Sequence, residues 1–205
     1  MPFDDQKIDE KNSDLFSVNK GMWIFILLDF ILFAGLLIYH FIGGLDFQTE
    51  YSFAKSELLL SFGFFNTIIL LTSGLTMGLA KVAALDRNKF LSMVFISVTV
   101  VFGLLFMVNR VIDCTYLAGK DYLYGLESFE SLNEGLSLFF TSYFFTFFIF
   151  MLHLFAGLVM LFITLLKLIK TEEISREFSK LNSTVVYWSY LTMIWIFIFP
   201  ILFLI

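Results

Sequence analysis

The sequence predicts an all-α integral membrane protein, a bundle of five transmembrane helices. Hydrophobic residues make up 59% of the 205 residues, whereas charged residues make up 15%, and the mean hydropathy is +0.88. Soluble domains contain about 45–50% apolar and about 25% charged residues. A soluble chain of this composition would lack the polar residues needed to cover its core. The apolar runs are also continuous, unlike the alternating strands of a membrane β-barrel.

Five segments are long and apolar enough to span a bilayer, which takes about 20 residues per helix. We expect spans at residues 22–42, 58–80, 90–111, 136–166 and 185–205. The fourth segment exceeds one span, so we expect it to tilt or to project beyond the bilayer. The chain is therefore expected to form a polar tail, residues 1–20, and one membrane domain, residues 21–205.

Basic residues predict the orientation of these helices. Ten of the 13 Lys and Arg residues lie in the tail, the second connection and the fourth connection. They are Lys7, Lys11, Lys20, Lys81, Arg87, Lys89, Lys167, Lys170, Arg176 and Lys180. By the positive-inside rule we expect the N-terminus in the cytoplasm and the C-terminus outside. The net charge of −5 says little about partners, but the sequence has no basic stripe of the kind that indicates a nucleic-acid partner.

Ionisable side chains inside the apolar runs are the candidate functional residues, because each is costly in hydrocarbon. Asp29 lies in the first run and His153 in the fourth, while Arg110 and Asp113 share a helix face at the end of the third. Asp29 either fixes helix packing or has a lipid-binding or proton-linked role. Arg110 and Asp113 form either an interfacial ion pair or part of a proton path. His153 could equally hydrogen-bond a neighbouring helix.

The histidines and the cysteine argue against a cofactor in this chain. The sequence contains two histidines, His40 and His153, and one cysteine, Cys114. Haem with paired axial histidines needs two of them on facing helices, and these two are expected near opposite halves of the bilayer. A copper or two-metal site would need more ligands still. We therefore expect no cofactor, no metal and no catalytic residue, so that the chain is not an enzyme by itself.

Five segments, taken in order, form a set that carries a family resemblance. They are GMWIFILLDFILFAGLL, NTIILLTSGLTMGLA, FGLLFMVNRVIDCTY, FMLHLFAGLVML and VVYWSYLTMIWIFIFPILFLI. Together they resemble subunit III of haem–copper respiratory oxidases (cytochrome c and quinol oxidases), in its short five-helix bacterial form, over residues 20–205. Asp29 falls on an acidic position of that family, where Asp is typical of the quinol-oxidase branch. Asp113 falls on a second acidic position and His153 on the second of two paired histidines.

The chain also departs from the family pattern. Phe150 stands where the first of the paired histidines is expected, and Arg110 stands where Gln or Glu is usual. Ser189 and Thr192 replace the His and the Asp of the closing Tyr-Trp-His-Phe-x-Asp-x-x-Trp signature. That signature keeps Tyr187, Trp188 and Trp195. The chain therefore resembles a divergent member, which could also serve a nitric oxide reductase or an unusual oxidase.

The resemblance implies a non-catalytic subunit of a terminal respiratory oxidase in the bacterial inner membrane. It implies that the first two helices form one bundle and the last three another, with phospholipid in a V-shaped cleft between them. The implied partners are the catalytic subunit I, which would hold haem and copper, other oxidase subunits and membrane lipids, and a larger respiratory supercomplex is left open. The implied role is to stabilise the catalytic subunit and to support sustained oxygen reduction and proton uptake, with cytochrome c or quinol as the electron donor.

Site residues follow from this resemblance. The expected polar contacts of the cleft between the bundles are Asp29, Arg110, Asp113 and His153. The expected packing or interfacial anchors are Trp23, Tyr187, Trp188 and Trp195. The alternatives are an accessory subunit of a nitric oxide reductase, a membrane scaffold or assembly protein, and a small transporter. A transporter would need repeated halves, broken helices or a polar pore, and none is evident in the sequence.

Overall fold

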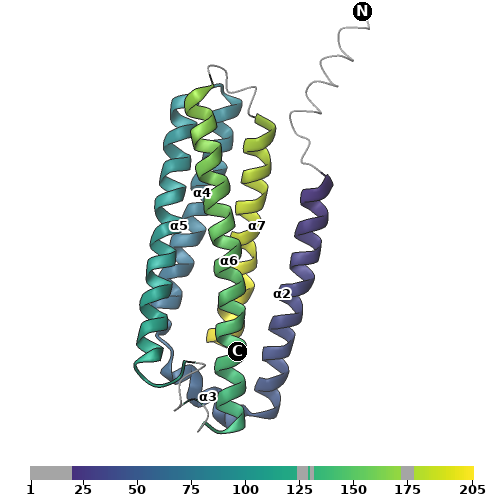
Figure 1. Ribbon diagram of the computed structural model, residues 1–205, viewed down its shortest axis with the longest axis vertical. Coiled ribbons are helices and arrows are strands. Elements are labelled where there is room, and N and C mark those ends of the chain that lie inside the picture. The colour runs from purple at the N-terminus through teal and green to yellow at the C-terminus, as the bar shows by residue number, and fades with distance from the viewer. Residues whose placement is uncertain (1–19, 124–128, 130–131, 172–177) are drawn as a thin grey trace, which may run out of the picture.

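The computed structural model describes residues 20–123, 129, 132–171 and 178–205 (Figure 1). Its long helices are α2 (Lys20–Asp46), α4 (Leu60–Leu85), α5 (Lys89–Ala118), α6 (Glu134–Lys170) and α7 (Phe178–Phe203). Each is long and apolar enough to cross a bilayer, so the five expected spans are confirmed. Helix α6, with 37 residues, is about 55 Å long and exceeds the bilayer core as expected. Residues 1–19, which make up nearly all of the expected tail, and Arg176 lie outside the described residues.

A short helix that hydropathy did not predict, α3 (Gln48–Glu57), connects α2 to α4. Its sequence QTEYSFAKSE is mostly polar, and it lies across one end of the bundle, at the bottom of Figure 1. Lys120, just beyond α5, forms a salt bridge of 2.6 Å with Glu57 of α3. This hydrogen bond raises the pKa of Lys120. We call this end of the bundle the α3 end and the opposite one the basic end.

The expected division into a two-helix and a three-helix bundle is wrong. Helix α4 packs against α5 and α7, and α6 packs against the same two helices, so α4 to α7 form one four-helix bundle. Helix α2 packs on the outside of α6 and α7, away from α4 (Figure 1). The reason is that α3 carries the chain beneath α6, so that consecutive spans need not be neighbours.

Small side chains allow α4 and α5 to approach closely. Ser92 of α5 donates a hydrogen bond of 3.0 Å to the Ala80 carbonyl of α4. The hydroxyls of Thr76 and Thr99 lie 2.8 Å apart across the same interface. Such contacts between small and hydroxyl-bearing residues hold membrane helices together where the hydrophobic effect between them is weak.

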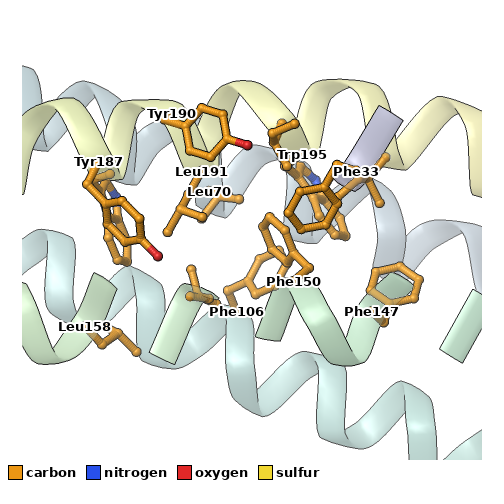
Figure 2. Packing of buried hydrophobic residues seen from close by; sticks show 14 of the residues in the cluster. Phe33, Leu70, Phe106, Phe147, Phe150, Leu158, Tyr187, Tyr190, Leu191 and Trp195 are labelled. Carbon is orange, nitrogen blue, oxygen red and sulfur yellow. The ribbon is translucent and has the colours of Figure 1, made fainter. Parts of the chain in front are cut away.

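Aromatic side chains fill the centre of the four-helix bundle (Figure 2). The Trp195 ring lies 4.8 Å from Phe106, 5.7 Å from Phe147 and 5.2 Å from Phe150, between ring centroids. Phe33 of α2 reaches the same group, 6.3 Å from Phe150. Phe150 is therefore part of the apolar core.

Trp188 fills a second part of the core, nearer the basic end. It is fully buried, and its indole N–H donates a hydrogen bond of 3.0 Å to Ser73. Gly103 and Gly157 make room for the ring, because a Cβ atom at Gly103 would lie 2.8 Å from it and one at Gly157 would lie 3.1 Å from it. Trp188 of α7 therefore contacts α4, α5 and α6 and stabilises their packing.

Candidate functional site

Asp29 joins three helices near the middle of the structure. Its Oδ1 atom lies 2.9 Å from Nε2 of His153 on α6, and its Oδ2 atom accepts a hydrogen bond of 2.8 Å from the Tyr190 hydroxyl on α7. The Asp29 side chain is 5% exposed and the His153 side chain 20%. We call these three residues the Asp29 cluster; they form one polar attachment of α2 to the bundle.

The partners of His153 define how protons are arranged in the Asp29 cluster. Its Nδ1 atom lies 2.8 Å from the Ile149 carbonyl, and a carbonyl only accepts, so Nδ1 carries a proton. One further proton then lies between Nε2 and the Asp29 carboxyl group. Whether it resides on His153 or on Asp29, the pair has no net charge, which suits it to a membrane interior.

Arg110 and Asp113 form a second cluster, with Tyr143 of α6. The Arg110 Nη1 and Asp113 Oδ2 atoms lie 2.8 Å apart, in an ion pair that lacks hydrogen-bond geometry. Arg110 Nη2 donates a hydrogen bond of 3.1 Å to the Tyr143 oxygen, and the Tyr143 hydroxyl donates one of 2.9 Å to Asp113. The guanidinium group also lies 3.5 Å from the centroid of the Phe147 ring, a favourable cation–π contact. We call Arg110, Asp113 and Tyr143 the Arg110 cluster.

The structure brings the four expected polar residues together as two pairs, not as one network. Asp29 pairs with His153 between α2 and α6, whereas Arg110 pairs with Asp113 on α5. The Arg110 cluster lies toward the α3 end, since Asp113 is five residues from the end of α5. Neither pair connects a two-helix bundle to a three-helix bundle, because that division does not exist.

Two tyrosines complete these clusters, and sequence analysis missed both of them. Tyr190 and Tyr143 are buried, and each supplies a hydroxyl to a carboxylate. A signal was available, because a tyrosine hydroxyl within a membrane span needs a hydrogen-bond partner. Because the spans contain so few acidic side chains, Asp29 and Asp113 would have been the first candidates for that partner.

The four expected anchors fall into two kinds. Trp23 is 56% exposed near the start of α2, as an interfacial residue would be. The other three are buried packing residues, Tyr187, Trp188 and Trp195. The Tyr187 hydroxyl donates a hydrogen bond of 3.0 Å to the His153 carbonyl, so it supports the backbone of the Asp29 cluster.

The two histidines have different partners. His40 Nδ1 lies 2.7 Å from the Ser142 hydroxyl near the α3 end, whereas His153 lies beside Asp29. Within the residues that the structure describes, no group of three His, Cys, Asp or Glu side chains could hold a metal ion.

An apolar groove runs between α2 and α7. It consists of two pockets of about 260 and 280 Å³ that share Phe30, Ile194 and Phe197. Ala34 lines the pocket that lies toward the α3 end, and Tyr190 lines the pocket that lies toward the basic end. The groove therefore presents hydrocarbon side chains along the depth of the bilayer and passes close to the Asp29 cluster.

Replacing Tyr190 by phenylalanine should lower the free energy of unfolding by about 2 kcal/mol, because Asp29 loses a hydrogen bond in an apolar environment. SDS titration of the protein in mild detergent would measure this change in the free energy of unfolding. Ser97→Ala is the matched control, since that exposed hydroxyl bonds only to the Met93 carbonyl of its own helix. Equal effects of the two changes would show that the Tyr190 hydroxyl does not hold α2.

Comparisons with known proteins agree over nearly the whole chain. The family model described as "Cytochrome c oxidase subunit III" matches residues 13–205. The chain is 25% identical over 209 residues to a probable quinol oxidase subunit 3 of Staphylococcus epidermidis, covering 100% of this chain and 97% of that one. It is 24% identical over 188 residues to a cytochrome bo(3) ubiquinol oxidase subunit 3 of Buchnera aphidicola, covering 90% and 84%. A cytochrome bo(3) ubiquinol oxidase subunit 3 of Pseudomonas aeruginosa is 23% identical over 190 residues, covering 90% and 83%.

Proposed function

This chain belongs to the cytochrome c oxidase subunit III family, and from that premise we propose that it is the non-catalytic third subunit of a bacterial haem–copper terminal oxidase. In this role it stabilises the catalytic subunit I and supports sustained oxygen reduction and proton uptake. Five helices of spanning length and bacterial relatives support a multi-pass protein of the bacterial inner membrane. Haem and copper then belong to the catalytic partner.

The observation that carries this proposal is that the charged side chains within the spans are paired with one another inside the chain. Asp29 pairs with His153, and Asp113 pairs with Arg110. In both clusters a tyrosine from another helix completes the contact. These groups connect helices to one another, as a rigid scaffold requires, and the faces of α2 that point outward are apolar. An outward apolar face suits contact with lipid and with the helices of a larger subunit.

A quinol oxidase is the complex that the observations favour. The relatives described above are named as quinol or ubiquinol oxidase subunits. Asp29 also occupies the position at which aspartate is typical of the quinol-oxidase branch. The accessory subunit of a nitric oxide reductase and an assembly protein are outcomes that the experiment below distinguishes.

The test is affinity purification of the tagged chain in mild detergent, followed by a reduced-minus-oxidised visible spectrum and identification of the co-purifying chains. We expect haem absorbance together with a large, histidine-rich membrane partner whose oxygen consumption is driven by quinol. A partner that reduces nitric oxide instead would favour the reductase. A haem-free chain without a partner, from cells whose oxidase stays intact, would contradict the proposal and favour a scaffold or a transporter.

We further propose that the groove between α2 and α7 holds the acyl chains of a phospholipid. The larger side chain in Ala34→Trp should fill the groove, and phospholipid retained by the purified complex should fall several-fold in native mass spectrometry. Gly35→Trp introduces the same side chain one residue along α2, where the space is open, and should retain lipid. Equal retention by both variants would show that the lipid binds elsewhere.

A further inference from the structure

The groove between α2 and α7 continues into a polar recess at the α3 end. The pocket of the groove nearer that end shares Phe41 and Ile201 with a pocket of about 220 Å³. This pocket shares Gly44, Gln48 and Tyr51 with another of about 490 Å³. We call these two further pockets the α3 recess. A molecule whose apolar part fills the groove can therefore extend its polar part into the α3 recess.

One face of α3 lines this recess. The residues that do so are Gln48, Tyr51, Ser52, Lys55 and Ser56. Residues three, four and seven apart share a face of a helix, so this set forms a single face. The two acidic residues of α3 are used on its other side. Glu57 pairs with Lys120, and Glu50 packs against Gly135 of α6, where a Cβ atom would lie 2.8 Å from it.

Lys55 is the charged side chain of the α3 recess, the only one among the described residues that line the two pockets. It is partly buried and forms no ion pair or hydrogen bond with another described residue. Burial lowers the pKa of Lys55, because an ammonium group that loses hydration is less stable in its charged form. An anionic ligand would compensate for that lost hydration through a charge-assisted hydrogen bond.

His40 forms a polar wall of the recess on the side of α2. It is 2% exposed, and its Nδ1 atom lies 2.7 Å from the Ser142 hydroxyl, so this edge of the ring points to α6. Its Nε2 atom, at the other edge, has no hydrogen-bond partner among the described residues. An imidazole nitrogen accepts from a hydroxyl or, when protonated, donates to a carbonyl oxygen. The ester and glycerol groups of a phospholipid contain both kinds of partner.

The length of the adjoining pocket matches one leaflet of a bilayer. Along α2 this pocket extends from Phe30 to Phe41, which are eleven residues and about 16 Å apart on a helix. Half of the hydrocarbon core of a bilayer is about 15 Å thick. An acyl chain of the leaflet at the α3 end therefore fits the pocket, and the headgroup of the same lipid reaches the α3 recess.

We propose that the α3 recess binds the headgroup of an anionic phospholipid, with Lys55 as the partner of its phosphate group. This proposal rests on the phospholipid proposed above for the groove, and it adds the leaflet and the charge of the headgroup. A zwitterionic headgroup carries an ammonium group of its own, whose repulsion by Lys55 would offset part of the attraction to the phosphate. The recess therefore selects a lipid such as phosphatidylglycerol over phosphatidylcholine.

The test is the identity of the phospholipid that the purified complex retains. The complex is reconstituted in nanodiscs of equal parts phosphatidylglycerol and phosphatidylcholine and transferred to mild detergent, and the retained lipids are counted by native mass spectrometry. The groove lipid is the part that Ala34→Trp loses. We expect phosphatidylglycerol to exceed phosphatidylcholine several-fold in this part, whereas equal amounts of the two would overturn the proposal.

Two lysine variants locate the selectivity. Lys55→Gln should lower the ratio of the two lipids several-fold while the total groove lipid changes little. Lys120→Gln removes the same charge at the same end of the bundle, on the other side of α3, and should leave the ratio unchanged. An unchanged ratio in Lys55→Gln, or an equal fall in both variants, would overturn the headgroup site while the groove lipid stands.

Two other outcomes are separate from these. Full retention of lipid by Ala34→Trp would contradict the groove lipid itself, and this proposal with it. A carbodiimide crosslink from Lys55 to a carboxylate of another subunit would overturn the lipid headgroup in favour of a protein partner in the α3 recess.

Discussion

Replacing Asp113 by leucine should lower the free energy of unfolding by about 3–5 kcal/mol, because it leaves the buried Arg110 guanidinium without its carboxylate. Arg110 is 5% exposed and lies between α5 and α6, where Tyr143 and Phe147 cannot neutralise its charge. Steric trapping or SDS titration of the purified chain in detergent would measure the loss.

A double variant separates the charge effect from a simple loss of packing. Arg110→Met together with Asp113→Leu replaces both charges by apolar groups and should recover most of the stability lost in Asp113→Leu. Glu57→Gln removes the carboxylate of an exposed salt bridge, which should change stability very little. If the double variant is as unstable as Asp113→Leu, the unpaired arginine is not the cause.

Replacing Asp29 by leucine should loosen α2, whose outward apolar face we assign to contact with the larger subunit, and so weaken retention of this subunit in its complex while the haem content stays near normal. The change removes the partner of His153 and the acceptor of the Tyr190 hydroxyl, which together attach α2 to α6 and α7. A loss of about 3 kcal/mol is expected for a buried pair, which corresponds to about a hundredfold shift from docked to released α2. The measurements are the ratio of this chain to haem after detergent extraction and the decline of oxygen consumption during turnover.

Two variants control for charge and for position. Asp29→Asn keeps an acceptor for Tyr190, so the subunit should be retained better than in Asp29→Leu. Asp46→Asn removes an exposed carboxylate at the end of the same helix and should behave like the unaltered chain. Unchanged subunit ratio, turnover and lipid content in Asp29→Leu would exclude a role for Asp29 in holding α2.

The sequence by itself determined the class, the number of spans and the family. Bilayer thickness sets the length of an apolar run, so hydropathy locates the spans from local information alone. The cost of charge in hydrocarbon singled out Asp29, Arg110, Asp113 and His153, and each of them has a polar partner in the fold. The five family segments predicted membership correctly, as the match over residues 13–205 confirms. The ion pair of Arg110 with Asp113 was also predictable, because three residues along a helix bring them together.

Only the tertiary structure decided which helices are neighbours. Lipid is as apolar as a protein core, so a spanning helix carries no polar face that would indicate which side packs inward. The sequence therefore could not show that α2 lies against α6 and α7 and not against α4, nor that the polar segment of α3 would carry the chain beneath the bundle. The same reason hid the link from Asp29 to His153 and Tyr190, which are 124 and 161 residues away along the chain. Contacts between residues so far apart along the chain depend on how the five apolar helices pack against one another, which is a property of the whole fold.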